Sequence, residues 1–339
     1  MKSTIWAGRL ATASVAACLM LGTAARAEDT LRCAPGETYV MNVMVSGHPY
    51  WVPVYQGFKQ AAAAFGCETV FSGTPDYDIT KQIASFDQDL VKQPAGVLLH
   101  PMQSDPFIEP INRAIDSGID VVTFAADSPL SKRTAYVTSD NLAEAKFAAE
   151  EIVKQVGDSA EYAVLENPGQ SNHDLRVTAL IQYMEQHYPK MKLVGRQATN
   201  QDSTAAYRAT AAILQANPKL AAIWIPEAGS AEGAVTAILE AKADVLVMHA
   251  DITPATLEQI KAGNIHMALN PNQGIQGYMG FMAVFLAAHA DGFDPFNDYK
   301  VSGYNPMQIP FIDNGFAVIT KANADSFDLN AYMQGRDPG

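Results

Sequence analysis

Basic residues are scarce in this chain. Its 339 residues include 23 Lys and Arg against 36 Asp and Glu, so the net charge is −13 with neutral histidines. Nucleic-acid binding needs a basic face that neutralises phosphates, and docking on anionic lipid needs a basic patch. The composition therefore argues against both kinds of partner. Charged residues make up only 17% of the chain and aromatic residues 9%, so a folded rather than a disordered chain is expected.

Motifs that bind cofactors or activate nucleophiles are also missing. The chain has no GxGxxG after a strand, no GxxxxGK[S/T], no HExxH and no GxSxG, and its seven histidines are scattered. We therefore expect no cofactor and no metal. A pair of acids chosen from Asp127, Asp174, Glu227 and Asp251 could serve a glycosidase, but the sequence does not supply their separation. These absences favour binding over catalysis.

The first 27 residues have the pattern of a secretory signal peptide. Lys2 and Arg9 supply positive charge, Leu10–Gly22 is apolar, and Ala25-Arg26-Ala27 has small residues where a signal peptidase reads them. This pattern predicts cleavage after Ala27 and a soluble protein in the periplasm. A membrane anchor is disfavoured because the apolar run is too short, and a lipoprotein attached at Cys18 because apolar residues follow that cysteine.

Only two cysteines, Cys33 and Cys67, follow the predicted cleavage site. An oxidising compartment permits a disulfide between them, with two free thiols as the alternative. Cys33 precedes the first predicted strand and Cys67 precedes the second. If these strands are neighbours in a parallel sheet, both cysteines lie at one edge of it. The sequence therefore predicts a Cys33–Cys67 disulfide.

Short apolar runs alternate with longer amphipathic runs from Tyr39 onward, which is typical of parallel sheets covered by helices on both faces. Two sheets of five or six strands are more usual than one sheet of ten. The chain is therefore expected to form two α/β units that divide near Ser139. The predicted strands are residues 39–45, 68–71, 96–99, 120–124, 135–137, 162–165, 192–196, 221–225, 245–248, 265–269 and 316–320.

Ligands of open parallel sheets bind beyond the carboxyl ends of the strands. Two units that face each other would line a cleft with the loops at those ends. The loops predicted to do so are Ser46–Trp51, His100–Ser104, Ala125–Ser128, Glu166–Arg176, Glu227–Gly229 and Asp251.

Several of these segments resemble the periplasmic sugar-binding proteins of ribose-type ABC importers, and the resemblance extends over residues 39–320. It rests on the order and spacing of His48-Pro49-Tyr50-Trp51, Gly57-Phe58-Lys59, Val122-Thr123-Phe124 with Asp127, Val137 to Asn141, Arg176, Glu227 to Gly233, His249-Ala250-Asp251, and Asn270 to Tyr278. It implies the type I periplasmic binding protein fold, in which two similar, doubly wound parallel-sheet lobes are joined by a three-segment hinge and hold a ligand in the cleft between them.

The resemblance also implies where the lobes divide and what they bind. The crossings would lie near Ser139, Pro271 and Ser302. One lobe would then comprise residues 28–138 and 272–301, and the other residues 139–271 and 302–339. The implied partners are a small carbohydrate, the membrane permease of an ABC importer, and a chemoreceptor or sensor, and the protein is expected to be a monomer.

Ten residues occupy positions where the resemblance or the loop pattern places a sugar contact. Tyr50 and Trp51 match ring-stacking aromatics, which pack on the C–H face of a sugar, and Asp251 matches an Asp of the family, whose carboxylate takes sugar hydroxyls. The complete predicted set is His48, Tyr50, Trp51, Asp127, Asp174, Arg176, Glu227, Asp251, Asn270 and Asn272. Other roles remain open, such as core packing for the two aromatics and helix capping for Asp174.

Departures from the ribose-type pattern bear on the ligand. Ala125 and Ala126 stand where ribose binders carry an Asp-Arg pair, and Glu227 replaces an Asn. Ribose itself is therefore doubtful, and a hexose, deoxysugar, amino sugar or polyol all remain. The ligand core of a sugar-responsive repressor shares this fold, but it would need a DNA-reading helix pair where this chain has a signal peptide.

Overall fold

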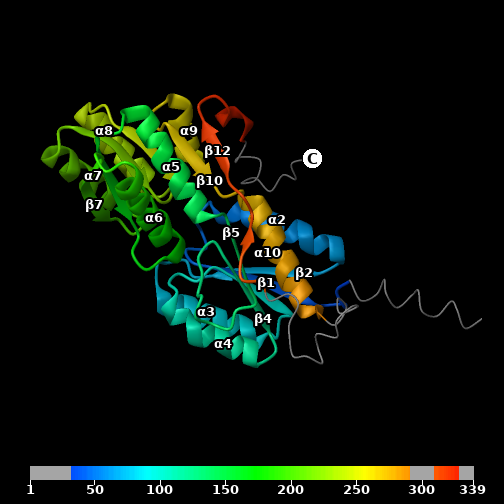
Figure 1. The fold of residues 1–339 in the computed structure, drawn as a ribbon. Coiled ribbons are helices and arrows are strands. Elements are labelled where there is room, and N and C mark those ends of the chain that lie inside the picture. The colour runs from blue at the N-terminus through cyan, green and yellow to red at the C-terminus, as the bar shows by residue number, and fades with distance from the viewer. Residues whose placement is uncertain (1–31, 291–308, 328–339) are drawn as a thin grey trace, which may run out of the picture.

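The computed structural model describes residues 32–290 and 309–327, which form two lobes, each built on one six-stranded sheet (Figure 1). The first sheet has the strand order β11-β5-β4-β3-β1-β2 and the second has the order β12-β10-β9-β8-β6-β7. Neighbouring strands pair in parallel except β10 and β12, which are antiparallel. The α/β class and the two parallel-sheet lobes predicted from the sequence are thus confirmed.

The first lobe places helices on both faces of its sheet. The strands are β1 (Thr38–Val43), β2 (Glu68–Gly73), β3 (Gly96–Leu99), β4 (Asp120–Phe124), β5 (Ala135–Thr138) and β11 (Ile312–Asp313). The helices are α2 (Trp51–Phe65), α3 (Ile79–Val91), the short η1 (Asp105–Phe107), α4 (Ile108–Asp116) and α10 (Gln273–Ala288). Helices α2 and α10 pack together on one face, and α3 and α4 cover the other (Figure 1).

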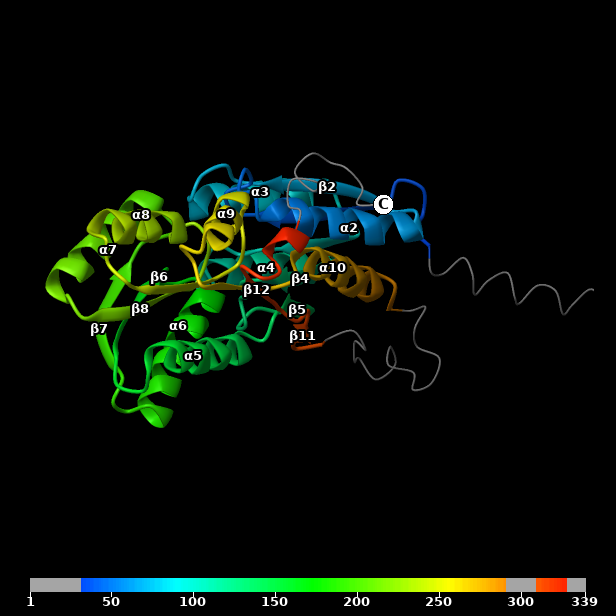
Figure 2. The same cartoon turned by 90° about the horizontal axis from the view of Figure 1, so that it is seen from above.

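The second lobe repeats this plan. Its strands are β6 (Glu161–Glu166), β7 (Lys192–Ala198), β8 (Leu220–Ile225), β9 (Leu246–Ala250), β10 (Met267–Asn270) and β12 (Ala317–Thr320). Its helices are α5 (Asn141–Val156), α6 (Ser171–His187), α7 (Ser203–Ala216), α8 (Ala231–Ala241), α9 (Pro254–Ala262) and the short η3 (Ala324–Ser326). Helices α5 and α6 lie on one face, whereas α7, α8 and α9 lie on the other (Figure 2). None of the helices in the part of the chain that the structure describes is long and apolar enough to cross a membrane.

Helices α2 and α10 approach each other closely because both carry glycine at the contact. A Cβ atom added at Gly277 would lie 1.8 Å from the backbone oxygen of Val54, and one added at Gly57 would lie 1.9 Å from that of Gly274. Neither position can therefore hold a side chain unless the helices separate. This close packing attaches α10, which follows the second lobe in the sequence, to the first lobe.

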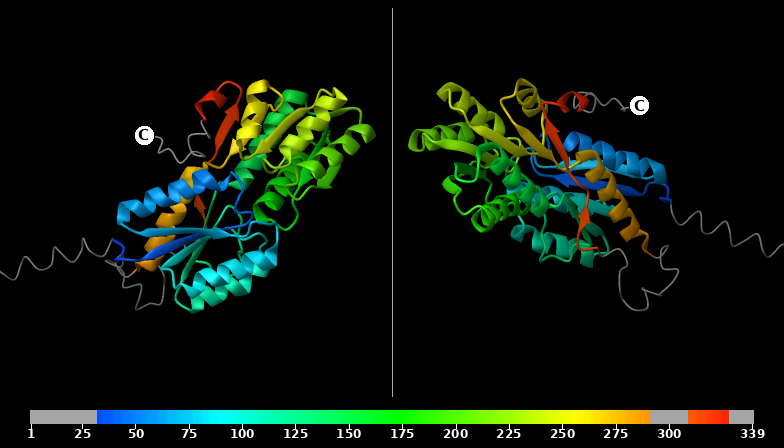
Figure 3. Two further views of the ribbon diagram at one scale, coloured as in Figure 1. Left: turned by 180° about the vertical axis from the view of Figure 1, so that it is seen from behind. Right: turned by 45° about the horizontal axis from the view of Figure 1, so that its top comes forward.

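The chain passes between the lobes three times. It leaves the first sheet between β5 and α5, returns between β10 and α10, and crosses again between β11 and β12. Figure 3 shows the last of these as the red segment that runs from one lobe to the other. The third crossing corrects the expectation that residues 302–339 belong to the second lobe, because Ile312 and Asp313 pair with Val137 and Thr138 of the first sheet.

The difference has a simple physical reason. Strand β11 contains only two residues, and so short a strand has no alternation of apolar and polar side chains that a sequence could reveal. Ser302, where the resemblance placed this crossing, lies outside the described residues, as do residues 1–27, the predicted signal peptide.

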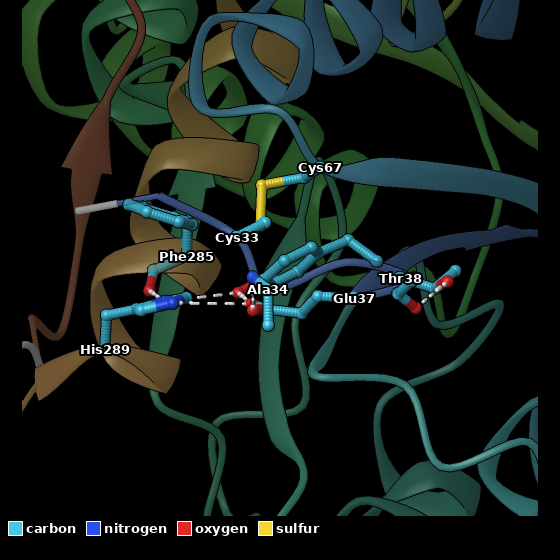
Figure 4. Close-up of a disulfide and its surroundings, with 9 residues drawn as sticks. Cys33, Ala34, Glu37, Thr38, Cys67, Phe285 and His289 are labelled. Atoms are coloured by element: carbon cyan, nitrogen blue, oxygen red, sulfur yellow. Dashed lines mark hydrogen bonds and ion pairs between the residues drawn. A yellow bond between two sulfur atoms is a disulfide. The ribbon is translucent and has the colours of Figure 1, made fainter. Parts of the chain in front are cut away.

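The predicted disulfide between Cys33 and Cys67 is present. It joins the segment before β1 to the start of β2, beside the end of α10 (Figure 4). The Glu37 carboxylate lies in the same region, where it accepts a hydrogen bond from the Tyr39 hydroxyl at 2.8 Å and lies 3.4 Å from Nε2 of His289. The disulfide and these polar contacts hold the first residues of the lobe against its sheet and against α10.

Candidate functional site

A cavity of about 240 Å³ lies between the two lobes. The first lobe lines it with residues that follow β1, β2, β3 and β4, namely Met44, Val45, His48, Tyr50, Trp51, Tyr77, His100 and Ala125. The second lobe lines it with residues that follow β6, β7, β8 and β9, namely Gln170, Asn172, His173, Asn200, Gln201, Asp202, Glu227, Ala228 and Asp251. The cavity is therefore at the carboxyl ends of both sheets, where parallel sheets bind their ligands.

Tyr50 and Trp51 line this cavity with their rings, while their polar atoms bond to the protein. The Trp51 Nε1–H donates to the backbone oxygens of Met44 at 2.8 Å and Val45 at 3.1 Å. The Tyr50 hydroxyl donates to Oε1 of Gln276 on α10 at 2.9 Å. The two rings make an edge-to-face contact at 4.9 Å between centroids. Because their hydrogen-bond donors are already used, they offer a ligand mainly apolar and aromatic surface.

Two histidines of the cavity have ring nitrogens that contact nearby amide groups. Nδ1 of His48 accepts the backbone N–H of Tyr50 at 3.1 Å. Nδ1 of His173 lies 3.0 Å from Nδ2 of Asn167, and the Asn167 oxygen accepts the backbone N–H of Gln201, so the amide must donate to the ring. The His48 ring therefore carries its proton on Nε2. Both ring nitrogens of His173 face amide nitrogens, because Nε2 lies 3.5 Å from Nε2 of Gln170, whose oxygen accepts from Gln201. Burial lowers the pKa of both side chains, which keeps them neutral.

A third histidine supplies an unsatisfied polar atom. His100 is buried against Trp51, and its Nδ1 has no hydrogen-bond partner among the described residues. Burial lowers the pKa of His100 to about 3. The side-chain oxygen of Asn172, across the cavity, is likewise buried and unpartnered in the described part of the chain. A buried polar group without a partner costs free energy, and both of these residues line the cavity, where a polar ligand could supply the missing hydrogen bonds.

Glu227 and Asp251 bring carboxylates to the cavity from the second lobe. The oxygens of Glu227 accept the backbone N–H of Ser230 at 3.1 and 3.2 Å. The Asp251 carboxylate lies 3.6 Å from Nη1 of Arg176. Burial raises the pKa of both acids, and that of Asp251 reaches about 7 although Arg176 opposes the shift. The structure thus brings together five of the predicted site residues: His48, Tyr50, Trp51, Glu227 and Asp251.

Arg176 lies behind the residues of the second lobe that line the cavity and is not one of them. Its side chain is fully buried, its Nε is 2.6 Å from Oε2 of Glu144, and its Nη1 donates to the backbone oxygen of Pro226 at 3.0 Å. It is absent from the residues that line the cavity. Its guanidinium therefore acts as a buried counter-ion beneath Asp251, not as a group exposed to the ligand.

Asp127 and Asp174 also lie outside the cavity lining. The Asp127 carboxylate forms a two-pronged pair with Arg133 at 2.6 and 2.8 Å, and its backbone N–H donates to the hydroxyl of Ser171 in the second lobe at 2.8 Å. The Asp174 carboxylate accepts the backbone N–H of Gly169 at 2.9 Å, in the first turn of α6. Asp127 thus contributes a contact between the lobes, and Asp174 stabilises a helix start.

The two predicted asparagines lie at the second crossing rather than in the cavity lining. Asn272 has the left-handed φ of 45° and donates from Nδ2 to the backbone oxygen of Asn314 at 3.2 Å. It therefore joins the second crossing to the third. The side-chain oxygen of Asn270 is buried without a partner in the described residues. The structure places both asparagines in the hinge.

Several cavity residues were not predicted. Tyr77 and Asn200–Asp202 were missed because the loops after the second and seventh strands were not considered as site segments. The polar run Asn200-Gln201-Asp202 after β7 is a signal that could have revealed them. A further sign of a functional site appears only in the backbone: Val45, Ala125, Asn200, Gln201 and Asp251 all have positive φ and all line the cavity. Such strained conformations gather at ligand sites.

The chain belongs to the family of the periplasmic binding protein domain, which matches residues 39–292. This family consists of ligand-binding proteins rather than enzymes, and its members are periplasmic in bacteria. The described residues contain no group of three or more His, Cys, Asp or Glu that could hold a metal ion.

Three similar proteins illustrate the family. The D-allose-binding periplasmic protein of Escherichia coli K12 is 25% identical over 254 residues, which cover 71% of this chain and 81% of that protein. The structure of AraP, an arabinose-binding protein from Geobacillus stearothermophilus, has a TM-score of 0.76 and 27% identity over 87% of this chain and all of that one. A sugar-binding protein of a sugar ABC transporter from Bacillus halodurans has a TM-score of 0.79 and 27% identity, over 86% of this chain and all of that one.

Proposed function

We propose that this protein is an exported receptor that captures a monosaccharide or related polyol and delivers it to the permease of an ABC importer. The observation that carries the proposal is the cavity between the lobes, which is lined by aromatic residues of the first lobe and by acidic residues of the second. The relatives that bind allose and arabinose support it.

The chemistry of the cavity suits a small polyhydroxylated molecule. Tyr50 and Trp51 provide flat surfaces for the C–H face of a sugar ring, while Asp251 and Asn172 provide acceptors for hydroxyl groups. The Nε2–H group of His48 provides a donor. The volume of about 240 Å³ is below the usual range for drug-sized ligands, which favours a single sugar ring over an oligosaccharide.

The site also explains how a sugar would close the protein. A ligand that contacts Trp51 and Asp251 at once touches both lobes, so it makes all its contacts only when the lobes meet. It therefore binds the closed state better, and this difference in affinity shifts the population toward closure. Ser171 and Asp127 contact each other across the same cleft and support the closed arrangement.

Export and partner choice complete the proposal. We infer removal of residues 1–27, a mature chain that begins at Glu28 and is located in the periplasm, and a monomeric receptor. An importer permease is the partner, and a chemoreceptor or sensor remains a prediction of the resemblance. The intact mass of the exported protein tests the cleavage site, since retained residues or a lipid on Cys18 would contradict it.

A thermal-shift screen of pentoses, hexoses, deoxysugars, amino sugars and polyols tests the binding function. A ligand present at about 100 times its Kd adds about 2.7 kcal/mol to the free energy of unfolding, so a true ligand raises the melting temperature clearly. Calorimetry with that ligand should show at least tenfold weaker binding for Asp251→Ala, because hydrogen bonds to charged groups contribute about 1.5–3 kcal/mol.

The matched control is Asp174→Asn, which changes an acid outside the cavity lining and should bind as the wild type does. Small-angle scattering with and without the ligand should show a more compact protein when it is bound. If no sugar or polyol stabilises the protein, the proposed function is wrong. If a sugar binds but Asp251→Ala leaves its affinity unchanged, Asp251 has no part in the site.

A further inference from the structure

The charge around the cavity has one sign. Asp202, Glu227 and Asp251 bring three carboxyl groups to its lining, and no Lys or Arg lines it within the described part of the chain. The three histidines do not offset these acids. Burial lowers the pKa of His48 and His173, and it lowers that of His100 to about 3, so all three rings are neutral near pH 7.

The nearest cation is already matched by another acid. The guanidinium of Arg176 lies 2.6 Å from Glu144 and 3.6 Å from Asp251, so its single charge is shared by two carboxylates. Glu227 has no ion pair among the described residues; its carboxylate accepts neutral hydrogen bonds, from the Ser230 N–H and from the side chain of Asn167. When Asp251 and Glu227 are both ionised, they therefore carry negative charge that no cation of the described residues balances. Without a ligand, burial raises the pKa of both acids, that of Asp251 to about 7, so a proton removes part of this charge; a bound cation would favour the ionised forms.

The polar atoms of the cavity lining that have no hydrogen-bond partner in the described residues are also mainly acceptors. The Asp251 carboxylate accepts no hydrogen bond from residues 32–290 or 309–327, and the side-chain oxygen of Asn172 is buried and unpartnered there. An ammonium group has three donors and no acceptor, which complements such a wall. The rings of Tyr50 and Trp51 on the opposite wall can attract a cation through their faces.

We propose that the ligand of this cavity is an amino sugar whose protonated amine lies against Asp251 and Glu227. The inference rests on the proposed sugar-binding function and narrows it to one class of sugar. The same wall would reject uronic acids and sugar phosphates, because a ligand carboxylate or phosphate would face like charges without a compensating Lys or Arg.

The test compares sugars that differ only in charge. For the gluco, galacto and manno series, calorimetry at pH 7.0 measures the affinity of the 2-amino sugar, its neutral parent, its N-acetyl derivative and the corresponding uronic acid. In at least one series, the amine should bind at least tenfold more tightly than the parent, and the uronic acid should not bind measurably. The N-acetyl derivative, which lacks the charge, should not share this gain.

Two variants assign the effect to the carboxylate. Asp251→Asn keeps the size of the side chain but removes its charge, so it should remove most of the difference between the amine and its parent. Asp174→Asn, outside the cavity lining, should keep that difference. If a neutral parent or an acid binds as tightly as the amine, the inference is overturned while the sugar-binding function stands. If no member of any series binds, and none stabilises the protein in the broader screen, the sugar-binding function itself fails.

Discussion

The buried ion pair between Arg176 and Glu144 permits a sharp test of whether Arg176 is a structural counter-ion rather than a residue that contacts the ligand. Arg176 is 1% exposed and Glu144 is fully buried, and the atoms Nε and Oε2 that join them are 2.6 Å apart. The Glu144 carboxylate also accepts a hydrogen bond from the Ser139 hydroxyl at the first crossing. The change Arg176→Met keeps an unbranched, although shorter, side chain but removes its charge. It leaves Glu144 buried without a counter-ion and also removes the cation that lies 3.6 Å from Asp251.

Removing one partner of a buried ion pair lowers the free energy of unfolding by about 3–5 kcal/mol, because the remaining charge stays buried away from water. This is a large part of the roughly 5–15 kcal/mol by which folded proteins are stable. We therefore expect Arg176→Met to lower the free energy of unfolding by about 3–5 kcal/mol. Urea unfolding followed by circular dichroism and by tryptophan fluorescence measures the loss.

The double variant Arg176→Met, Glu144→Leu is the matched control, since it removes both charges of the closest pair. Asp251, which also loses this cation, has a pKa raised to about 7 by burial and can take up a proton. Replacing a complete buried pair by apolar side chains is often neutral, so the double variant should recover most of the stability that the single variant loses. A loss below about 1 kcal/mol in the single variant, or no recovery in the double variant, would refute the interpretation of Arg176 as a buried counter-ion.

Three further predictions follow from other parts of the structure. Gly277→Ala places a Cβ 1.8 Å from a backbone oxygen of α2 and should lower the free energy of unfolding in urea by about 3 kcal/mol. Gly274→Ala, whose added Cβ would be 3.8 Å from its nearest neighbour, should lower it little. Equal effects of the two changes would contradict the close packing. Replacing Cys33 and Cys67 by Ser opens a bridge across a sequence separation of 34 residues and should cost about 3–4 kcal/mol, and an unchanged urea midpoint would argue against the bridge. Burial raises the pKa of Asp251 from 3.8 to about 7, so its protonated form stabilises the ligand-free fold at low pH and that contribution is lost as pH rises to 7. Asp251→Asn should therefore raise the melting temperature more at pH 8 than at pH 5. A difference that does not change with pH would contradict the shift.

The order of strands and helices was largely predictable because it depends on residues that are neighbours in the sequence. Strands β3 (Gly96–Leu99) and β4 (Asp120–Phe124) have the predicted bounds, since apolar runs define them locally. The disulfide was predictable too, because the positions of Cys33 and Cys67 before adjacent strands required only the strand order.

The site was only partly predictable. The rule that ligands bind at the carboxyl ends of parallel strands located the loops, and the resemblance selected Tyr50, Trp51 and Asp251 from them. Neither source could separate an acid that faces the cavity from one that is already paired. Asp127 is neutralised by Arg133, six residues further along the chain, and both lie outside the cavity lining.

Tertiary structure alone decided these roles, because each depends on groups far apart in the sequence. Arg176 became a counter-ion because α5 brings Glu144, 32 residues away, to within 2.6 Å of it. Strand β11 joined the first lobe because Ile312 pairs with Val137. The sequence by itself determined the local elements, the α/β class and the loops near the cleft. The pairing of charges, the surplus of carboxylates around the cavity and the third crossing arise from long-range packing, which no local pattern of residues encodes.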